Sequence, residues 1–268
     1  MGIFTSRPTY DPASDIPDLK GKVCLVTGGN AGIGYETVSE LVKHGTKVYI
    51  GARNESRATG AIAKLKAQGC LDGPNAGQVL WLELDLSTPA SSGRAAEGFI
   101  RRETRLDILV NNAGLAAWGP GAFTLIQGKV PVITIMSTKY ISPKPLGPVR
   151  AYNNSAAIDK IDSSGTWVAS SGHSDSKGFD WKSADGWNFK SEGFIAGIQA
   201  YGTTKLANIL FAKELQHVFD EQGTNALSIT LHPGGVNIDF IQGMKSSSAI
   251  GYTLYSIVDF FGFFATPE

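Results

Sequence analysis

Tyr201 and Lys205 are the residues of this chain whose types and spacing best suit proton transfer. They lie four residues apart in a predicted helix over about 200–219, so both side chains leave one helical face about one turn apart. A nearby ammonium favours the phenolate form of a tyrosine, whose ordinary pKa is ~10. Ser171, after a predicted strand over 166–169, could hydrogen-bond the same substrate oxygen. A Tyr/Lys pair at this spacing is more often structural, so its meaning depends on the other motifs.

A glycine-rich turn, TGGNAGIG at 27–34, follows a predicted strand and opens a predicted helix, which is the context that a dinucleotide-binding turn requires. Its glycines allow a tight turn and a close approach of the backbone to a pyrophosphate, and the helix N-terminus supplies N–H donors. The alternative is that the glycines serve only strand-to-helix packing. The residues of the turn expected to bind a cofactor are Gly28, Asn30, Gly32, Ile33 and Gly34.

The segment after the second predicted strand, IGARN at 50–54, bears on the choice of nucleotide. A free ribose 2′-hydroxyl usually meets an acidic residue here, and this segment has none. Arg53, helped by Arg57, instead offers a guanidinium fork suited to a 2′-phosphate, so NADP is favoured over NAD. The alternative is an ordinary solvated arginine. Asp85, after the third predicted strand, is expected at the adenine edge, with a loop cap as the competing interpretation.

Short β-branched runs alternate with helical stretches from residue 22 onward, which indicates βαβ units. The predicted fold is a single α/β domain, 21–268, with a doubly wound Rossmann-type parallel sheet, preceded by a solvated arm over 1–20. The proline-bearing segment 115–164 is irregular. Strands are predicted over 22–26, 47–50, 79–84, 106–110, 166–169 and 226–231, and helices over 32–44, 55–67, 89–103 and 200–219.

Composition excludes several classes of protein. With 268 residues, 42% of them hydrophobic, the chain can bury a sizeable core. Its 24 basic and 24 acidic residues favour neither nucleic acid nor an anionic membrane as partner. Two cysteines cannot build a disulfide framework and fit a reducing, cytoplasmic compartment. No metal site is expected, because the histidines and cysteines lack ligand spacing. No transmembrane segment is expected either, because the apolar run 249–265 is shorter than the roughly 20 residues that a span needs.

Taken together, the motifs resemble those of the short-chain dehydrogenases/reductases. LDILVNNAG and YGTTKLANILFAKEL are similar to the retinol-dehydrogenase-like and fungal biosynthetic branch, and the resemblance covers about residues 20–265. The motifs that carry it, in this order, are TGGNAGIG, NNAG at 111–114, Ser171, YGTTK at 201–205 and HPGG at 232–235.

The resemblance implies a nicotinamide cofactor, with Tyr201 as general acid/base, Lys205 as its pKa-lowering and ribose-binding partner, and Ser171 as stabiliser of the substrate oxygen. The further residues that it implies to line the cofactor are Asn112, Ala113, Pro233 and Val236. The expected function is an NADP-dependent oxidoreductase that transfers hydride between the nicotinamide and a carbonyl or alcohol of a small, fairly apolar molecule, in secondary-metabolite biosynthesis. Helices with such a pair commonly pack into homodimers or homotetramers, and the sequence does not decide between these states.

Three departures from the family pattern support an alternative, a catalytically impaired nucleotide-binding module. Lys139 stands where the family has an asparagine, and a lysine cannot accept a hydrogen bond. Ile238 replaces a threonine, which removes a hydroxyl near the carboxamide of the nicotinamide. The chain ends soon after HPGG, so the last strand of the family is expected to be missing. A truncated or misread gene model, with the segment 126–157 as a second symptom, is the hypothesis that explains this ending.

Overall fold

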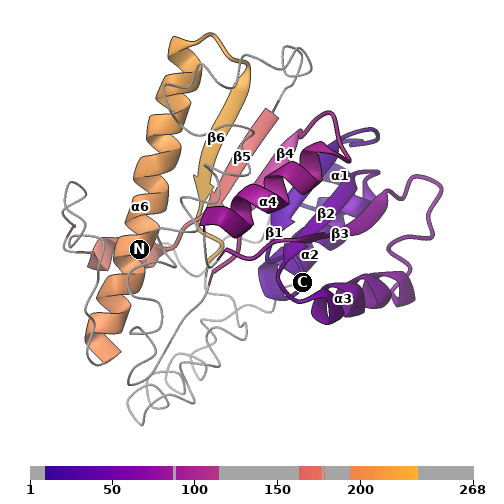
Figure 1. Cartoon of the computed structure of the whole chain (residues 1–268), viewed down its shortest axis with the longest axis horizontal. Coiled ribbons are helices and arrows are strands. Elements are labelled where there is room, and N and C mark those ends of the chain that lie inside the picture. The colour runs from indigo at the N-terminus through magenta and orange to yellow at the C-terminus, as the bar shows by residue number, and fades with distance from the viewer. Residues whose placement is uncertain (1–9, 87–88, 115–162, 177, 179–193, 235–268) are drawn as a thin grey trace.

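The computed structural model describes residues 10–86, 89–114, 163–176, 178 and 194–234, which form a parallel sheet with helices on both faces (Figure 1). The strands lie in the order β3-β2-β1-β4-β5-β6, the doubly wound order that was predicted. The strands are β1 (Val23–Thr27), β2 (Lys47–Ala52), β3 (Gln78–Glu83), β4 (Ile108–Asn111), β5 (Ser163–Val168) and β6 (Ala226–Leu231). The helices are α1 (Pro12–Asp15), α2 (Gly32–Lys43), α3 (Glu55–Ala67), α4 (Pro89–Ile100) and α6 (Phe194–Glu221), with a 3-10 helix, η2 (Ser171–Asp175).

The structure differs from the prediction mainly at element ends. β5 begins at Ser163 rather than at 166, because pairing with β4 and β6 holds its Ser-Ser-Gly start in the sheet against its weak strand propensity. α6 begins at Phe194 rather than at about 200. The expected solvated arm contains α1 and is anchored where the amide of Leu19 donates to the carbonyl of His44 (2.8 Å). Among the described helices, even α6 with its 28 residues is not apolar enough over sufficient length to cross a bilayer.

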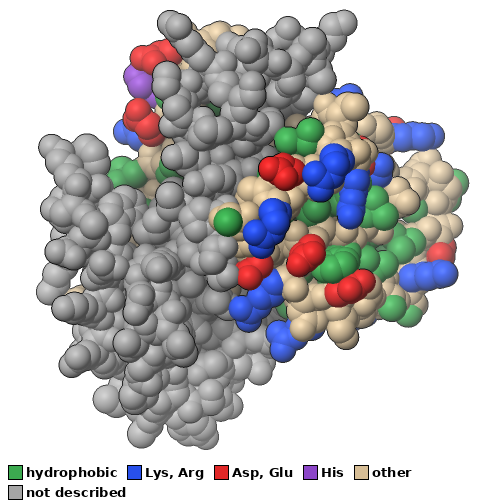
Figure 2. Space-filling view, viewed as in Figure 1, with side chains coloured by type: hydrophobic (Ala, Val, Ile, Leu, Met, Phe, Trp, Pro, Cys, Tyr) green, Lys and Arg blue, Asp and Glu red, His purple; other side chains and the backbone are tan. Residues whose placement is uncertain are grey.

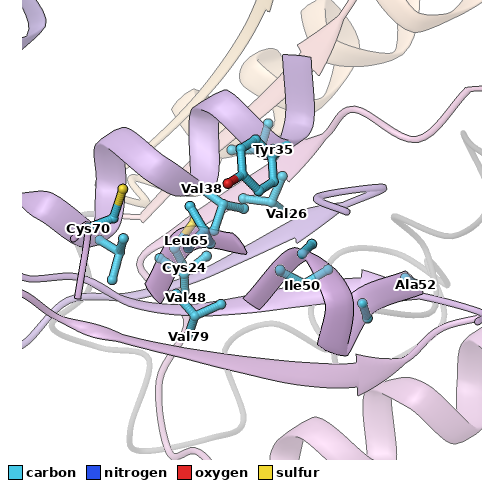
Figure 3. Close-up of a cluster of buried hydrophobic side chains, with 14 residues drawn as sticks. Cys24, Val26, Tyr35, Val38, Val48, Ile50, Ala52, Leu65, Cys70 and Val79 are labelled. Atoms are coloured by element: carbon cyan, nitrogen blue, oxygen red, sulfur yellow. The ribbon is translucent and has the colours of Figure 1, made fainter. Parts of the chain in front are cut away.

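One face of the sheet packs against α2 and α3 (Figure 3). Side chains of β1 and β2 that point to this face, such as Val26 and Ile50, meet Val38 of α2 and Leu65 of α3, and all four are fully buried. Cys24 and Cys70 lie in the same cluster as free thiols, which agrees with the expected absence of a disulfide framework. This packing fixes the starts of α2 and α3 above the carboxyl ends of β1 and β2.

The other face packs against α4 and α6. Tyr49 of β2 and Phe99 of α4 make an edge-to-face contact with their ring centroids 5.1 Å apart. Trp167 is in register with Asn111 and therefore shares this face, where it packs against Phe211 of α6 at 5.7 Å between centroids. At 1% exposure Trp167 is a core residue.

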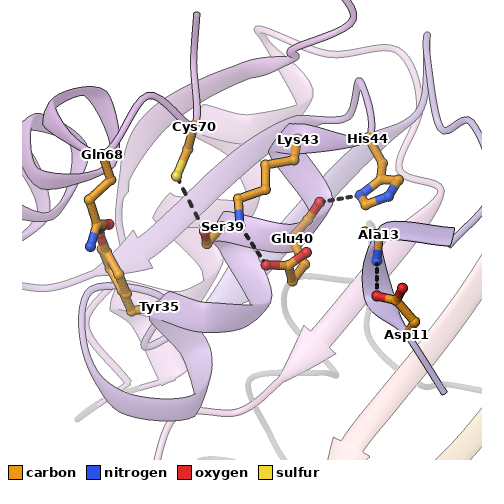
Figure 4. A network of polar contacts seen from close by, with 9 residues as sticks. All are labelled: Asp11, Ala13, Tyr35, Ser39, Glu40, Lys43, His44, Gln68 and Cys70. Atoms are coloured by element: carbon orange, nitrogen blue, oxygen red, sulfur yellow. Dashed lines mark hydrogen bonds and ion pairs between the residues drawn. The ribbon is translucent and has the colours of Figure 1, made fainter. Parts of the chain in front are cut away.

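Polar contacts attach α2 to residues just after the end of α3 (Figure 4). The Tyr35 hydroxyl donates to Gln68 Oε1 (2.5 Å), and the hydroxyl of Ser39 lies 3.5 Å from the thiol of Cys70. Near the end of α2, the ammonium of Lys43 donates to the carboxylate of Glu40 (2.7 Å), and Nδ1 of His44 lies 2.8 Å from the carbonyl of Glu40. The Tyr35 and Ser39 contacts hold α2 and α3 as one layer.

On the described part of the face shown in Figure 2, acidic and basic side chains are intermixed.

β6 is the outer strand of the described sheet, and α6 covers part of its open edge. The side chain of Gln216 accepts a hydrogen bond from the amide of Ser228 (2.7 Å) and donates to the carbonyl of Ala226 (3.4 Å). Gln216 therefore occupies backbone groups of β6 that a further strand would use. The expectation of a missing last strand concerns residues after 234, outside the described ranges.

A buried carboxylate joins β1 to β4 at the opposite end of the sheet from their carboxyl ends. Asp107 is 1% exposed, accepts a hydrogen bond from the amide of Val23 (2.8 Å), and pairs with the guanidinium of Arg105 and with Lys22 Nζ (3.3 Å). Burial alone would raise the pKa of Asp107, but these hydrogen bonds and the charge of Arg105 lower it below its ordinary value.

We expect Asp107→Asn to lower the free energy of unfolding at neutral pH by about 1–3 kcal/mol, because hydrogen bonds to a buried charge are lost. Since the folded-state pKa is lowered, this stabilisation exists above the ordinary pKa of ~3.9 and disappears as the pH falls through the folded-state value. Urea unfolding at neutral and acidic pH should therefore show the gap between wild type and variant closing in acid. Asp72→Asn, at an exposed position, is the control, and a gap independent of pH would contradict the assignment.

Candidate active site

The glycine turn lies between β1 and α2, and no side chain within the described ranges caps the first N–H groups of α2. Ala31 at the N-cap makes no side-chain hydrogen bond, and the first turn holds no acidic residue. Gly28 and Gly32 have φ values of 67° and 54°, which favour glycine. Unsatisfied N–H groups and the positive end of the helix dipole together suit a bound phosphate.

Asn112 joins this turn to the end of β4. Its side-chain amide donates to the carbonyls of Thr27 (3.0 Å) and Gly28 (3.4 Å), and the amide of Ala113 donates to the hydroxyl of Thr27 (2.9 Å). A Cβ on Gly34 would collide with both the Asn112 amide and the Gly28 carbonyl, so glycine at 34 is needed for this packing, a role that the sequence did not distinguish from an approach to pyrophosphate. β1 and β4 are neighbours at the point where the strand order reverses, which is where doubly wound sheets open a ligand crevice.

Arg53 and Arg57 both have exposed side chains just beyond β2, next to β1 in the sheet. Asn54 caps α3 by accepting a hydrogen bond from the amide of Arg57 (2.9 Å), which fixes the path of the chain after Arg53. Within the described ranges neither guanidinium takes part in an ion pair. Asp85 is half-buried after β3, and its carbonyl accepts a hydrogen bond from the hydroxyl of Ser91 (2.7 Å) in the first turn of α4.

Lys205 is held at the carboxyl end of β5, where its ammonium donates to the carbonyl of Val168 (2.8 Å). The Lys205 ammonium lies 5.5 Å from the centre of the Tyr201 ring. Glycine follows Tyr201 because a Cβ on Gly202 would collide with the carbonyl of Gly172, where α6 crosses η2. The structure therefore brings the Tyr/Lys pair to the carboxyl end of the strands, the same end as Asn112 and the glycine turn.

The protonation of this pair differs from the expectation. Burial raises the pKa of Tyr201 above its ordinary value, and a hydrogen bond from Ser170 only partly offsets this. Burial also lowers the pKa of Lys205 to about 8. The expected lowering of the Tyr201 pKa by Lys205 is not among the causes of its shift, and loss of hydration disfavours phenolate and ammonium alike.

Ser170, rather than Ser171, is the serine that contacts Tyr201. The hydroxyl of Ser170 accepts a hydrogen bond from the amide of Gly172 (3.2 Å) and bonds to the phenol of Tyr201. Ser171 begins η2 and is exposed. Ser170 was missed because the two serines are adjacent and chemically identical in sequence, and only the turn into η2 decides which one faces α6.

Two of the remaining predicted residues follow β6. Pro233 is half-buried in the loop after this strand. The predicted residue Val236 and the departures at Lys139 and Ile238 lie outside the described residues.

Comparison with known proteins fits this geometry. Residues 22–139 match the short chain dehydrogenase family. The short chain dehydrogenase/reductase dpfgH of Gibberella zeae is 40% identical over 236 residues, which cover 84% of this chain and 62% of that protein, so the chain spans less than two thirds of that relative. The short-chain dehydrogenase/reductase pyiH of Pyricularia grisea is 32% identical over 233 residues, covering 82% of this chain and 92% of that protein.

A solved structure, the Pseudomonas aeruginosa RhlG/NADP active-site complex, matches with a TM-score of 0.62 at 23% identity over 93% of this chain and 86% of that one, which shows the shared fold. The matched family, the relatives and the fold agree with the motifs that bring Tyr201, Lys205 and the glycine turn to one edge of the sheet. The chain belongs to the short-chain dehydrogenase/reductase family.

Proposed function

We propose that this chain is an NADP-dependent oxidoreductase that acts on a carbonyl or alcohol of a small, fairly apolar molecule. The observation that carries the proposal is the hydrogen bond from Lys205 to the carbonyl of Val168. It holds Tyr201 and Lys205 beside the strand ends that carry Asn112 and the glycine turn. A proton-transfer pair and an anion-binding helix end thus share one edge of the sheet.

The described residues fit a dinucleotide. The start of α2 offers N–H donors without a competing acid, and Arg53 is exposed next to β1 without an ion-pair partner in the described ranges. Lys205 would hold the nicotinamide ribose, and Asp85 would meet the adenine. The other residues proposed to hold the cofactor are Gly28, Asn30, Gly32, Ile33, Gly34, Arg57, Asn112, Ala113, Pro233 and Val236.

The bound nicotinamide would supply or accept the hydride. Because its pKa is raised, the phenol of Tyr201 keeps its proton at neutral pH and can donate it to a carbonyl oxygen during reduction. In the opposite direction the same oxygen accepts the proton of an alcohol. Ser171 is proposed to hydrogen-bond the substrate oxygen, and Ser170 to orient the Tyr201 phenol. Lys205, with a pKa of about 8, is mostly charged at neutral pH and keeps donors for the ribose.

The substrate class and a role in secondary-metabolite biosynthesis are supported by the resemblance to the fungal biosynthetic branch. Fungal short-chain dehydrogenases/reductases are among the relatives, with dpfgH at 40% identity. A homodimer or homotetramer through α6 is likewise proposed from the family resemblance.

Tyr201→Phe tests the central role. We expect the rate of ketone or aldehyde reduction to fall by about a hundredfold or more, because the ring remains but the proton donor is lost. NADPH consumption across a panel of carbonyl compounds measures the rate, and calorimetry measures NADPH binding, which should stay within about twofold. Tyr35→Phe removes a phenol that donates to Gln68, away from the proposed catalytic pair, and should leave the rate unchanged. NADPH binding without turnover by the wild type would instead support the nucleotide-binding module.

The two adjacent serines form a matched pair for a second test. Ser170→Ala removes the hydrogen bond that lowers the Tyr201 pKa, so the pH dependence of alcohol oxidation should move to higher pH by about half to one unit. Ser171→Ala should lower the rate and leave the pH dependence in place. Profiles of kcat/KM against pH for both variants decide the matter. A shift in the Ser171 variant alone would exchange the two assignments.

Arg53→Ala tests the cofactor preference. Loss of charged hydrogen bonds to the 2′-phosphate should weaken NADPH binding by about tenfold or more, while NADH binding changes little. Calorimetric titration with each cofactor measures both affinities. Arg101→Ala, which removes an exposed guanidinium just after α4, serves as the control. A wild-type preference for NADH would contradict the assignment of Arg53.

A further inference from the structure

We propose that Trp81 is a positioning residue for NADP selection, because its indole N–H holds the peptide group from which Arg53 leaves β2. The inference rests on the proposed function of Arg53 as the ligand of the 2′-phosphate. Trp81 lies on β3 and is in register with Ile50 of β2. Its Nε1 donates to the carbonyl of Ala52 at 2.9 Å, two residues further along β2. The side chain thus reaches along the sheet toward the end of β2, where the nucleotide is expected.

The acceptor of this bond determines the direction of Arg53. The carbonyl of Ala52 belongs to the same planar peptide group as the nitrogen of Arg53, so fixing the carbonyl also fixes the direction in which the Arg53 backbone continues. On the other side of Arg53, Asn54 is fixed by its bond to the amide of Arg57 (2.9 Å). Arg53 therefore lies between two restrained neighbours while its own side chain is exposed. A guanidinium on a restrained backbone loses less conformational freedom when it binds an anion.

The indole bond is not needed to satisfy the Ala52 carbonyl. That carbonyl also accepts a hydrogen bond from the amide of Leu84 (3.2 Å), which continues the pairing of β2 with β3. If the indole N–H is removed, the carbonyl keeps a partner and the strands stay paired. What is lost is the second hydrogen bond to the Ala52 carbonyl, which comes from the face of the sheet that packs against α3. The expected effect therefore falls on the orientation of Arg53 more than on folding.

Trp81→Phe, measured in the full chain, separates these roles. The phenyl ring keeps most of the packing of Trp81 against the core and removes only the donor. Calorimetric titration should show NADPH affinity reduced about threefold to tenfold, the loss expected for one hydrogen bond, with NADH affinity changed by less than about twofold. Tyr49→Phe is the matched control, because it also removes one hydrogen bond from an aromatic residue of this sheet, to Glu103 (2.6 Å), on the opposite face. It should leave the ratio of the two affinities unchanged.

The double variant Trp81→Phe with Arg53→Ala tests whether Trp81 acts through Arg53. If it does, the double variant binds NADPH as Arg53→Ala alone does, because the restrained side chain is already absent. Additive losses, or equal losses for NADPH and NADH in Trp81→Phe, would overturn the inference while the role of Arg53 stands. If Arg53→Ala itself leaves the preference for NADPH unchanged, both the proposed cofactor assignment and this inference are overturned.

Discussion

The hydrogen bond from the Lys205 ammonium to the carbonyl of Val168 connects the candidate active site to the fold. It joins α6, which carries Tyr201 and Lys205, to β5, an inner strand of the described sheet, at the end of the strands where the glycine turn also lies. Asn208, one turn later on α6, directs its side-chain amide to the same carbonyl at 3.5 Å. Burying an ammonium here has a cost, and the lowered pKa of Lys205 reflects it.

The two ends of the sheet differ in whether their charged and polar groups have partners among the described residues. At the amino end of β1 and β4, the buried Asp107 has several donors, so its role is to hold strands together. At the carboxyl end, the first N–H groups of α2 lack a side-chain acceptor and Arg53 lacks an ion-pair partner within the described ranges. Satisfied polar groups stabilise the fold, whereas groups left without partners are available to a ligand. This contrast, more than any single motif, distinguishes the structural end of the domain from the end that carries the proposed site.

Local signals explain how much of this could be predicted from the sequence. α3 and β6 were predicted with their observed bounds, because Asn54 caps the helix and turn residues flank the strand. The glycine turn and the Tyr201–Lys205 spacing likewise indicated the site, since helix periodicity alone puts that pair on one face. Contacts between distant elements were not predictable in this way. Only the pairing of β3 with β2 shows that Trp81 reaches the carbonyl before Arg53, and only the crossing of α6 over η2 selects Ser170.

The shared burial of Tyr201 and Lys205 also bears on the proposed proton transfer. Loss of hydration raises the pKa of the phenol and lowers that of the ammonium, so the pKa of Lys205 falls below that of Tyr201. At neutral pH the phenol then remains a proton donor while the lysine is still mostly charged, which is the combination that carbonyl reduction needs. Alcohol oxidation needs the phenolate, which the same burial disfavours. On the proposed role of Tyr201, the environment of the pair keeps the phenol ready to donate a proton at neutral pH, while the ratio of reduced to oxidised cofactor still sets the net direction.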